Sequence, residues 1–491
     1  MSQQDKALYR CEQIRACELL AKQLLQRDEH SLMLQAGTDA FTLMKKLYPK
    51  AKHIAVFCGV GNNAGDGYVL ARIAHEHHYK VTVYQCRAIE DLPPVAHHAA
   101  QQALDSGVEF QSAEESLDNE SDLIIDALLG VGLKGPVHGL IANAITQIND
   151  SQLPVMSLDV PSGLNADSGV VDGFCVKATS TMTFIGLKTG MYTMDGPDVC
   201  GDIYRSSLDL EVCLEKCQPH AFLLADDQLP LPLPLRKKNS HKGKYGHVLV
   251  IGSGVGMPGA VSLVAKAALR TGAGLVTVAT WPEHVHGPLP LIPEAMIMGV
   301  DSAQDLKPLL AKATVCVLGP GLGESDWATE LFNAAISAQL PMVMDASALR
   351  LLAAHPQMDD NWVLTPHAGE ASSLLLTSVN AVQNDRYHSA ESIQQQYGGV
   401  VVLKGVGTII QTAAKEKFVC PKGNPGMASA GMGDVLSGII AGFCAQGMSL
   451  SDAAKAGVWA HAYAGDKAAE AKGEIGLLAT DLFDYIPGII N

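Results

Sequence analysis

The sequence predicts an α/β protein with two domains, each a three-layer αβα sandwich. Three observations lead to this expectation. The chain has 491 residues, 47% hydrophobic and only 18% charged, which is enough for two full cores. Short apolar runs typical of buried strands alternate with helical patterns in both halves. Residues 226–242 combine alternating prolines with a basic run, and such a segment does not pack.

We therefore expect one domain over residues 1–225, a linker over 226–242 and a second domain over 243–491. The basic run Arg236 to Lys242 could serve a phosphate, but we interpret it as a solvated connector.

The charge balance excludes several classes of partner. The net charge of −16 would repel nucleic acid and anionic membranes. The eleven cysteines show no CxxC pair, which indicates reduced thiols and a cytoplasmic protein. With neither a signal-peptide pattern nor an apolar run of membrane-spanning length, we expect no membrane association. We also expect a homo-oligomer.

The first half begins its sheet with the apolar run 53–60. This run ends in Gly61-Asn-Asn-Ala-Gly-Asp-Gly67, and a helical pattern follows from Tyr68. Strand, glycine-rich turn and helix together predict a Rossmann-like, doubly wound sheet with a phosphate-type site at the turn. The turn carries Asn62, Asn63 and Asp66 instead of bare glycines, so oxygen ligands and hydrogen bonds are expected there as well.

Polar residues follow further predicted strands, which are 81–86, 123–128, 155–159 and 181–185. Asp126 ends the second of these, and Asp159 ends the third, just before Ser162. Ligands bind at the carboxyl ends of such strands. Asn63, Asp126 and Ser162 could supply hard oxygen ligands to an alkali metal ion or Mg²⁺. The alternative is that Asp126 and Asp159 only cap helices or close turns.

The second half repeats the pattern with strands expected at 247–251, 274–280, 315–318, 342–345, 362–364 and 400–403. The first leads through a glycine-rich turn into a helix over 260–271. Later strands lead into the loops GPGLG (319–323), TPHAGE (365–370) and KGVGT (404–408).

The loop Asn424 to Asp434, NPGMASAGMGD, organises this half. Gly431 and Gly433 let successive backbone N–H groups face one concavity at a helix start, which suits a phosphate. A carboxylate would repel that phosphate, so Asp434 is better explained as a base facing the attacking group. The alternative is a glycine-rich turn with Asp434 as the helix N-cap.

Taken in this order, the loops of the second half resemble the ribokinase-type fold. His367 stands where sugar kinases usually have Asn, and the set resembles the ADP- or ATP-dependent dehydratases of hydrated NADH and NADPH. The motifs GNNAGDG, GVGLKGP and DVPSG of the first half are similar to those of the epimerase that acts on the same hydrates. Nearly the whole chain thus resembles the bifunctional NAD(P)H-hydrate repair enzymes.

The resemblance implies four sets of binding residues and their cofactors. The epimerase half would bind the hydrate through Asn62, Asn63, Ala64, Gly65, Asp66, Gly130, Val131, Gly132, Leu133, Lys134, Gly135, Pro136 and Asp159. It would bind K⁺ through Asn63, Asp126 and Ser162. The dehydratase half would bind the hydrate through Ala260, Gly323, His367 and Asp434. It would bind ADP, used with Mg²⁺, through Lys404, Gly405, Val406, Gly407, Thr408 and Gly433.

Two catalytic roles follow as hypotheses. Asp434 takes the proton of the hydrate hydroxyl while that oxygen attacks ADP. Asp159 carries a proton in epimerisation, with Asp126 as the alternative.

For two other residues the sequence leaves two possible roles open. Glu370 could hold Mg²⁺ through water or be a surface acid at a helix start, and Lys404 could pair with phosphate or end its strand. The rival functions are a vitamin or sugar kinase fused to a nucleotide-binding domain, and a first domain that only binds.

Overall fold

The computed structural model describes residues 6–133, 135–226, 229, 231, 233–287 and 291–491. These residues form two compact units, and the division falls between Phe222 and Leu223. Among the described residues, no helix combines the length and the apolar character needed to cross a bilayer. The expected boundaries at 225 and 243 stay predictions. In the segment expected as a linker, the Arg236 guanidinium donates to the Gly272 carbonyl at 2.5 Å and lies over the Tyr245 ring, 3.7 Å from its centroid.

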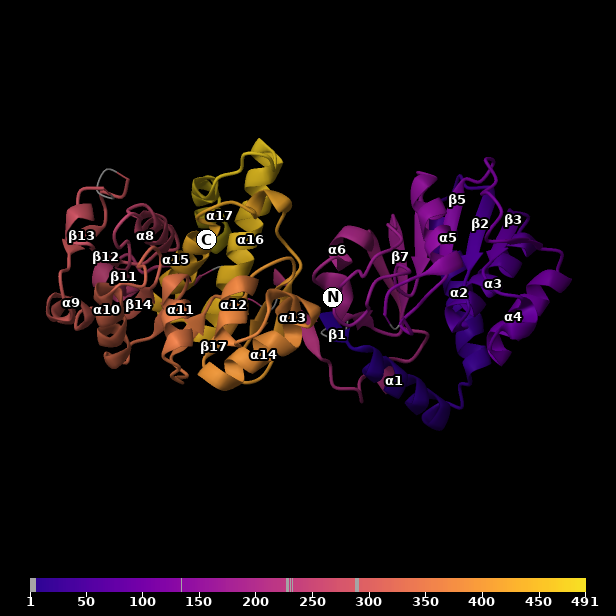
Figure 1. Cartoon of the computed structure of the whole chain (residues 1–491), viewed down its shortest axis with the longest axis horizontal. Coiled ribbons are helices and arrows are strands. Elements are labelled where there is room, and N and C mark those ends of the chain that lie inside the picture. Colours follow the sequence, from indigo (N-terminus) through magenta and orange to yellow (C-terminus); the bar gives the residue numbers. More distant parts are fainter. Residues whose placement is uncertain (1–5, 134, 227–228, 230, 232, 288–290) are drawn as a thin grey trace. The chain divides into compact units, whose positions relative to one another are not determined.

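The first unit contains a parallel sheet with strand order β4-β3-β2-β5-β6-β7-β9 (Figure 1). The strands are β2 (His53–Cys58), β3 (Lys80–Gln85), β4 (Glu109–Ser112), β5 (Leu123–Ala127), β6 (Val155–Leu158), β7 (Ser180–Phe184) and β9 (Asp202–Ser206). The order reverses between β2 and β5, which is where ligands bind in a doubly wound sheet. Beside it, β1 (Ala7–Tyr9) pairs with β8 (Leu187–Lys188) and with β10 (Ala221–Leu223).

Helices cover both faces of this sheet, because alternate residues of the strands belong to different cores. Ile54, Val56 and Cys58 of β2 pack with α2, α3 and α4, whereas Ala55 and Phe57 pack with α5. The helices are α1 (Cys11–Leu24), α2 (Glu29–Leu47), α3 (Asn62–Glu76), α4 (Pro94–Asp105), α5 (Gly139–Asp150), α6 (Gly196–Val199) and α7 (Glu211–Leu214). The expected three layers are thus present.

The second unit has the strand order β13-β12-β11-β14-β15-β16-β17-β18-β19, parallel from β13 to β17 and antiparallel beyond. The strands are β11 (His247–Ile251), β12 (Leu275–Thr280), β13 (Met296–Gly299), β14 (Val315–Leu318), β15 (Met342–Met344), β16 (Trp362–Leu364), β17 (Val400–Leu403), β18 (Thr408–Gln411) and β19 (Lys417–Cys420). The central strands match their predicted ranges to within a residue. The sequence reading missed β13 and the β18–β19 hairpin.

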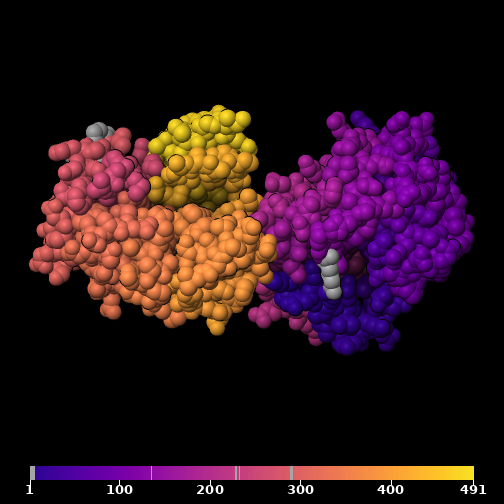
Figure 2. Space-filling view, in the orientation of Figure 1, coloured from indigo at the N-terminus to yellow at the C-terminus, as the bar shows by residue number. Residues whose placement is uncertain are grey.

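Two groups of helices pack on this sheet. The first group contains α8 (Ala260–Arg270), α15 (Met432–Ala445) and α16 (Leu450–Lys472), in which α15 contacts both of the others. The second contains α9 (Ala303–Leu310), α10 (Asp326–Ser337), α11 (Ser347–Ala354), α12 (Ala368–Leu374), α13 (Val379–Asn384) and α14 (Arg386–Tyr397). The chain ends in α17 (Ile486–Ile490), and the C-terminal residues, yellow in the space-filling view, occupy the top of this unit (Figure 2).

Two expected loops are in fact helix starts. Gly61 is the N-cap of α3, so Asn62 to Gly67 lie in the helix and the predicted turn is shorter. The prediction failed because Gly65 and Gly67 serve close packing. A Cβ on Gly65 would lie 2.3 Å from the Met33 side chain, and one on Gly67 would lie 2.6 Å from the Ala127 Cβ.

The second such loop precedes α15. Its N-cap is Gly431, with a left-handed φ of 89°, and Asp434 is the third residue of the helix. The alternative in which Asp434 is the N-cap is therefore wrong.

Candidate active sites

In the first unit, Asp159 lies just beyond β6 and is tied to a buried lysine. Its backbone is left-handed, with φ 66°, which turns its side chain away from the strand direction. Its Oδ1 accepts a hydrogen bond from Lys188 Nζ at 2.6 Å, and its Oδ2 accepts one from the Val131 N–H at 3.2 Å. The second bond ties the predicted loop Gly130–Pro136 to Asp159. Lys134 of that loop lies outside the described residues.

Lys188 itself is fully buried. Its Nζ also donates to Thr183 Oγ1 and to the Phe184 carbonyl, both at 2.7 Å. With three acceptors for its three protons, the ammonium is fixed in place. A fixed charge of this kind orients the carboxylate of Asp159.

Asp66 of α3 faces the same acidic neighbourhood. Burial raises the pKa of the Asp66 carboxyl well above its usual range, and the charge of Asp159 adds to that rise. Lys188 opposes the shift but does not cancel it. Asp66 thus favours its neutral form more than an ordinary carboxyl does, while Asp159 has a cationic partner. Two acids with different environments are what a proton-transfer site requires.

Asp126 and Ser162 are brought together by the structure. Ser162 donates to Asp126 twice, through Oγ at 2.5 Å and through its N–H at 2.9 Å. Ser157 Oγ and the Leu128 N–H also donate to this carboxylate. Burial raises the pKa of the Asp126 carboxyl, and this effect outweighs the hydrogen bonds, which lower it. In the described part of the chain Asp126 has no ion pair, so its charge lacks a counter-ion.

Asn63 lies in the first turn of α3, where both polar atoms of its carboxamide are buried without a hydrogen-bond partner among the described residues. A Cβ placed on Gly130 would lie 3.3 Å from Asn63 Cγ and 3.1 Å from Asp159 Oδ2. Asn63, Gly130 and Asp159 thus line one space. A buried amide without a hydrogen-bond partner among the described residues is suited to bind a ligand there.

In the second unit, Asp434 has an unusual charge environment. Burial and the charge of Asp345 raise the pKa of this carboxyl to about 7, against the opposing effect of Lys404. A Cβ on Gly433 would lie 3.2 Å from both Asp345 Oδ2 and Lys404 Nζ. The start of α15 therefore borders these two charged groups.

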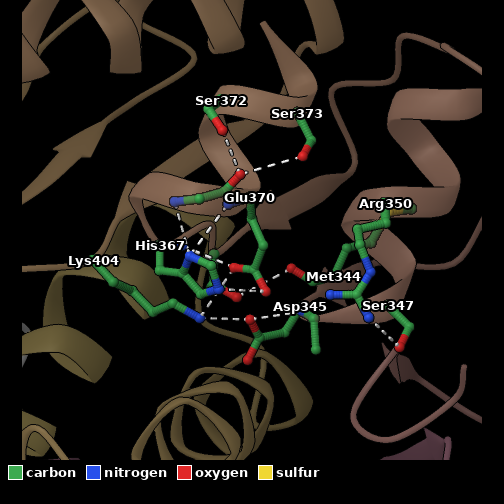
Figure 3. Close-up of polar contacts among 12 residues, drawn as sticks. Met344, Asp345, Ser347, Arg350, His367, Glu370, Ser372, Ser373 and Lys404 are labelled. Carbon is green, nitrogen blue, oxygen red and sulfur yellow. Dashed lines mark hydrogen bonds and ion pairs between the residues drawn. The ribbon is translucent and has the colours of Figure 1, made fainter. Parts of the chain in front are cut away.

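A chain of ionic contacts joins β15, α12 and the end of β17 (Figure 3). Lys404 Nζ lies 2.6 Å from Asp345 Oδ1 and 3.7 Å from Glu370 Oε2. His367 Nε2 lies 3.3 Å from Glu370 Oε1. Burial lowers the pKa of Lys404, but Asp345 and Glu370 outweigh that effect and raise it. The lysine is thus a fixed cation at the site.

Glu370 and His367 form a reciprocal cap at the start of α12. The His367 N–H donates to Glu370 Oε2 at 2.8 Å, and the Glu370 N–H donates to His367 Nδ1 at 3.2 Å. Glu370 is only 5% exposed, so its reading as a surface acid is wrong. The His367 side chain is 58% exposed, although its Nε2 faces the Glu370 carboxylate.

The predicted nucleotide loop, Lys404 to Thr408, is held by a buried arginine at the start of α14. Arg386 is 2% exposed and donates to the carbonyls of Leu403, Lys404 and Val406 at 3.0 to 3.2 Å. Gly405 has a φ of 142°, and a Cβ there would lie 2.5 Å from the Arg386 guanidinium. Glycine is required at this position.

The remaining predicted residues lie on neighbouring loops. Gly323, with φ 80°, donates its N–H to Ser347 Oγ at 3.1 Å. A Cβ on Gly321 of the same loop would lie 3.3 Å from Ala260 Cβ, so Ala260 at the start of α8 adjoins this loop. Thr408 Oγ1 donates to the Gly405 carbonyl at 3.0 Å, which closes the nucleotide loop.

Sequence reasoning missed four polar residues of these sites, namely Lys188, Asp345, Arg386 and Ser437. Asp345 follows β15 at a strand end, the same signal that identified Asp126 and Asp159. Ser437, which donates to Asp345 Oδ2 at 2.9 Å, is one turn beyond Asp434 on α15. Lys188 and Arg386 carry no motif, and only the fold reveals them.

The comparisons with known proteins cover both units. Residues 248–488 match the family described as NAD(P)H-hydrate dehydratase, and residues 29–190 match YjeF-related protein N-terminus. A ribokinase-like superfamily protein from Enterococcus faecalis superposes with TM-score 0.50 at 31% identity, covering 55% of this chain and 95% of that one.

Two relatives match nearly end to end. The chain is 49% identical over 488 residues to the bifunctional NAD(P)H-hydrate repair enzyme Nnr of Coxiella burnetii, covering 99% of each. It is 40% identical to the enzyme of the same name from Escherichia coli, covering 97% of this chain and 93% of that one. At this identity and coverage, the chain belongs to the family of bifunctional NAD(P)H-hydrate repair enzymes.

Proposed function

We propose that this chain repairs hydrated NADH and NADPH by two reactions. The first unit interconverts the R and S hydrates, and the second dehydrates the S hydrate with ADP, giving NAD(P)H, AMP and phosphate. The observation that carries the proposal is Asp434, a partly buried carboxyl whose pKa is raised to about 7 beside Lys404 and Asp345. A general base is most effective when its pKa is near the working pH.

In the dehydration step, Asp434 takes the proton from the hydroxyl on ring carbon 6 as that oxygen attacks the terminal phosphorus of ADP. The phosphoanhydride bond breaks and AMP leaves. The ring nitrogen lone pair then expels phosphate, a far better leaving group than hydroxide, and loss of a proton from carbon 5 restores the dihydronicotinamide. The N–H groups at the start of α15 and the cation of Lys404 are suited to the charge on the phosphate.

Mg²⁺ would supply charge neutralisation on the ADP phosphates when bound. The carboxylates Glu370 and Asp345 provide hard oxygen donors for it, directly or through water. Lys404 contacts both carboxylates and holds them in place. The metal ion could take over these contacts or share the carboxylates with Lys404, whose cation could then bind ADP.

Only one hydrate isomer presents its hydroxyl to the fixed carboxylate of Asp434. Epimerisation converts the other isomer into this reactive form. In the first unit, we assign the proton transfer to Asp159, which Lys188 orients. Asp126 is less suited, because four donors from Ser157, Ser162 and Leu128 already occupy its oxygens. The raised pKa of the neighbouring Asp66 favours its neutral form, which could donate a hydrogen bond.

The donor set of Asn63, Asp126 and Ser162 suits K⁺. Asp126 has a buried charge without a counter-ion, and the Asn63 carboxamide oxygen has no partner among the described residues. A flexible set of neutral and anionic oxygens is what an alkali metal ion binds. When bound, K⁺ would offset the charge of Asp126.

The test is to incubate a mixture of NADH hydrates with ADP and Mg²⁺ and follow the absorbance of the reduced nicotinamide. Full recovery of NADH with release of inorganic phosphate is expected, because epimerisation feeds the dehydratase. The rival kinase function predicts a stable phosphorylated product and no gain in absorbance. A first unit that only binds predicts that recovery stops at the S fraction, with or without K⁺.

We also propose a homo-oligomer in the cytoplasm. Leu19 and Leu24 of α1, Leu25 just after it and Leu34 of α2 are exposed apolar side chains that are available for self-association. All eleven cysteines are unpaired, as in a reducing compartment. Light scattering of the purified chain measures its mass. A monomer at micromolar concentration contradicts the proposed homo-oligomer.

A further inference from the structure

A second cluster of polar groups lies at the amino-terminal edge of β2 and β3, opposite the strand ends that carry Asp159. His53, the first residue of β2, faces Asp118 and Glu120 of the segment before β5. One ligand-type atom from each of the three residues lies within 4.8 Å of the others. None of these residues has a role in the reactions described above.

The His53 ring is buried, at 4% exposure, and only one of its nitrogens is satisfied. Nε2 lies 3.2 Å from Thr82 Oγ1, whereas Nδ1 has no hydrogen-bond partner among the described residues. In the tautomer that donates Nε2–H to Thr82, Nδ1 presents its lone pair to Asp118 Oδ2 at 3.7 Å. Two acceptors facing each other are unfavourable unless a cation lies between them.

The spacing also matches metal coordination better than a hydrogen bond. A distance of 3.7 Å exceeds the range of N–H···O bonds. It is close to the separation of about 3.4 Å between two ligands that each lie about 2.1 Å from a tetrahedral ion. The Nε2–Thr82 contact resembles the outer-shell bonds that fix the rings of metal-binding histidines.

The carboxylates are already arranged around a cation. Lys80 Nζ, from the start of β3, lies 3.2 Å from Asp118 Oδ2 and 3.0 Å from Glu120 Oε2. The Asp118 carboxylate is further held by the Glu120 N–H, which donates to Oδ1 at 2.9 Å. Lys80 is half exposed and can swing into solvent when another cation arrives.

We propose that His53, Asp118 and Glu120 bind a first-row divalent metal ion, with Zn²⁺ the best match for one imidazole and two carboxylates. The ion displaces Lys80, and water completes its coordination on the exposed side of Glu120. Because the site ties the start of β2 to the loop before β5, metal stabilises the first unit without entering the epimerase site.

The experiment titrates the full chain with Zn²⁺, and with Co²⁺ as a spectroscopic probe, by calorimetry and absorbance. Asp118→Asn and His53→Gln are expected to weaken binding at least about tenfold, since a lost ligand costs no less than a lost outer-shell partner. Thr82→Val, which leaves all three ligands in place, should weaken binding about tenfold or more for the same reason. Glu115→Gln, on the same loop, is the matched control and should bind like the parent chain.

Lys80→Met separates this proposal from a purely structural ion-pair cluster. Removal of the competing cation should tighten metal binding about threefold to tenfold. Zn²⁺ should also raise the melting temperature of the parent chain and of Lys80→Met, but not that of His53→Gln. Binding that is unchanged in His53→Gln and Asp118→Asn, or weakened in Lys80→Met, overturns the site.

Discussion

At the scale of single residues, Asp434 combines two properties that conflict in most proteins. It is partly buried, yet it must carry a charge in order to act as the proposed base. Burial and Asp345 bring its pKa to about 7 while Lys404 prevents a further rise. The carboxyl is therefore partly ionised at neutral pH and still basic enough to take a hydroxyl proton.

The first prediction concerns this base. Asp434→Asn should lower kcat for dehydration by about 10² to 10⁴ with little change in the KM for ADP, because it removes proton transfer but not binding. In the parent chain, log(kcat/KM) should rise with pH and level off above about 7. Steady-state assays across pH 5.5 to 9 measure both, and a parent profile that is flat across this range contradicts the assignment.

The same pKa predicts a cost in stability. In the unfolded chain Asp434 loses its proton near pH 4, whereas in the folded chain it keeps the proton up to about 7. Between these values the folded state binds more protons, so its stability falls as pH rises. Asp434→Asn should remove this loss, and its advantage over the parent should grow from pH 4 to pH 7 by up to about 4 kcal/mol and then stay constant.

Urea unfolding of both proteins at pH 4.5, 6 and 8 checks this expectation. Ser325→Ala, which removes the N-cap side chain of α10, is a control whose effect should not depend on pH. An Asn variant that gains nothing between pH 4.5 and pH 8 shows that the raised pKa is wrong.

How far the sequence alone predicts a site also depends on the residue. Asp126, Asp159 and Asp434 could be predicted as candidates because they end strands or adjoin glycine-rich segments. Lys188 and Arg386 were missed because their importance arises from burial beside polar groups 29 or 17 to 20 positions away. No local pattern encodes such a pairing.

At the scale of elements, the central strands were predicted well because each is a short apolar run. The predicted starts of α3 and α15 lie several residues beyond the observed ones, because the glycines in these segments suggested loops. In α3 the glycines permit the helix to approach the sheet, and this requirement depends on Met33 and Ala127, which lie elsewhere in the chain.

Glycine substitutions in this segment test that explanation. Gly67→Ala should destabilise the chain by about 1 to 3 kcal/mol, because its Cβ would lie 2.6 Å from Ala127 Cβ. Gly61→Ala is the matched control, since its backbone is extended and a Cβ there meets nothing within 4 Å. Chemical unfolding should give the control a value within about 0.5 kcal/mol of the parent. Equal losses in both variants contradict the packing role of Gly67.

Arg386 gives a prediction about the loop that follows β17. Arg386→Met removes hydrogen bonds to three carbonyls, and each bond to a charged group contributes about 1.5 to 3 kcal/mol. The loop should lose its fixed shape, so the KM for ADP should rise about tenfold or more. Arg386→Lys keeps the charge but not the planar fork and should recover only part of the affinity.

The epimerase activity of the same preparations is an internal control, because Asp159 and Lys188 belong to the other unit. If Arg386→Met leaves the KM for ADP unchanged, the guanidinium does not position the nucleotide loop.

At the scale of the whole molecule, each of the two units has its own set of charged site residues. Asp159 and Lys188 belong to the first unit, and Asp345, Lys404 and Asp434 to the second. No residue of one set is shared with the other, so the two reactions should be separable by mutation. The sequence predicted this division through the order of its motifs.

Asp159→Asn should abolish epimerisation and leave dehydration of the pure S hydrate at the parent rate. Replacement of the carboxylate removes the proton carrier and the partner of Lys188, whose buried charge then lacks its ion pair. Some loss of stability in the first unit is also expected, by about 3 to 5 kcal/mol if no water reaches the ammonium. Lys188→Met with Asp159→Asn removes both charges and should restore stability without restoring epimerisation.

With a mixture of hydrates, both variants should convert only the S fraction, and recovery of NADH should then stop until parent enzyme is added. Complete recovery by Asp159→Asn alone would falsify the assignment of Asp159. A parallel fall in the dehydration of pure S hydrate would instead mean that the two units do not work independently.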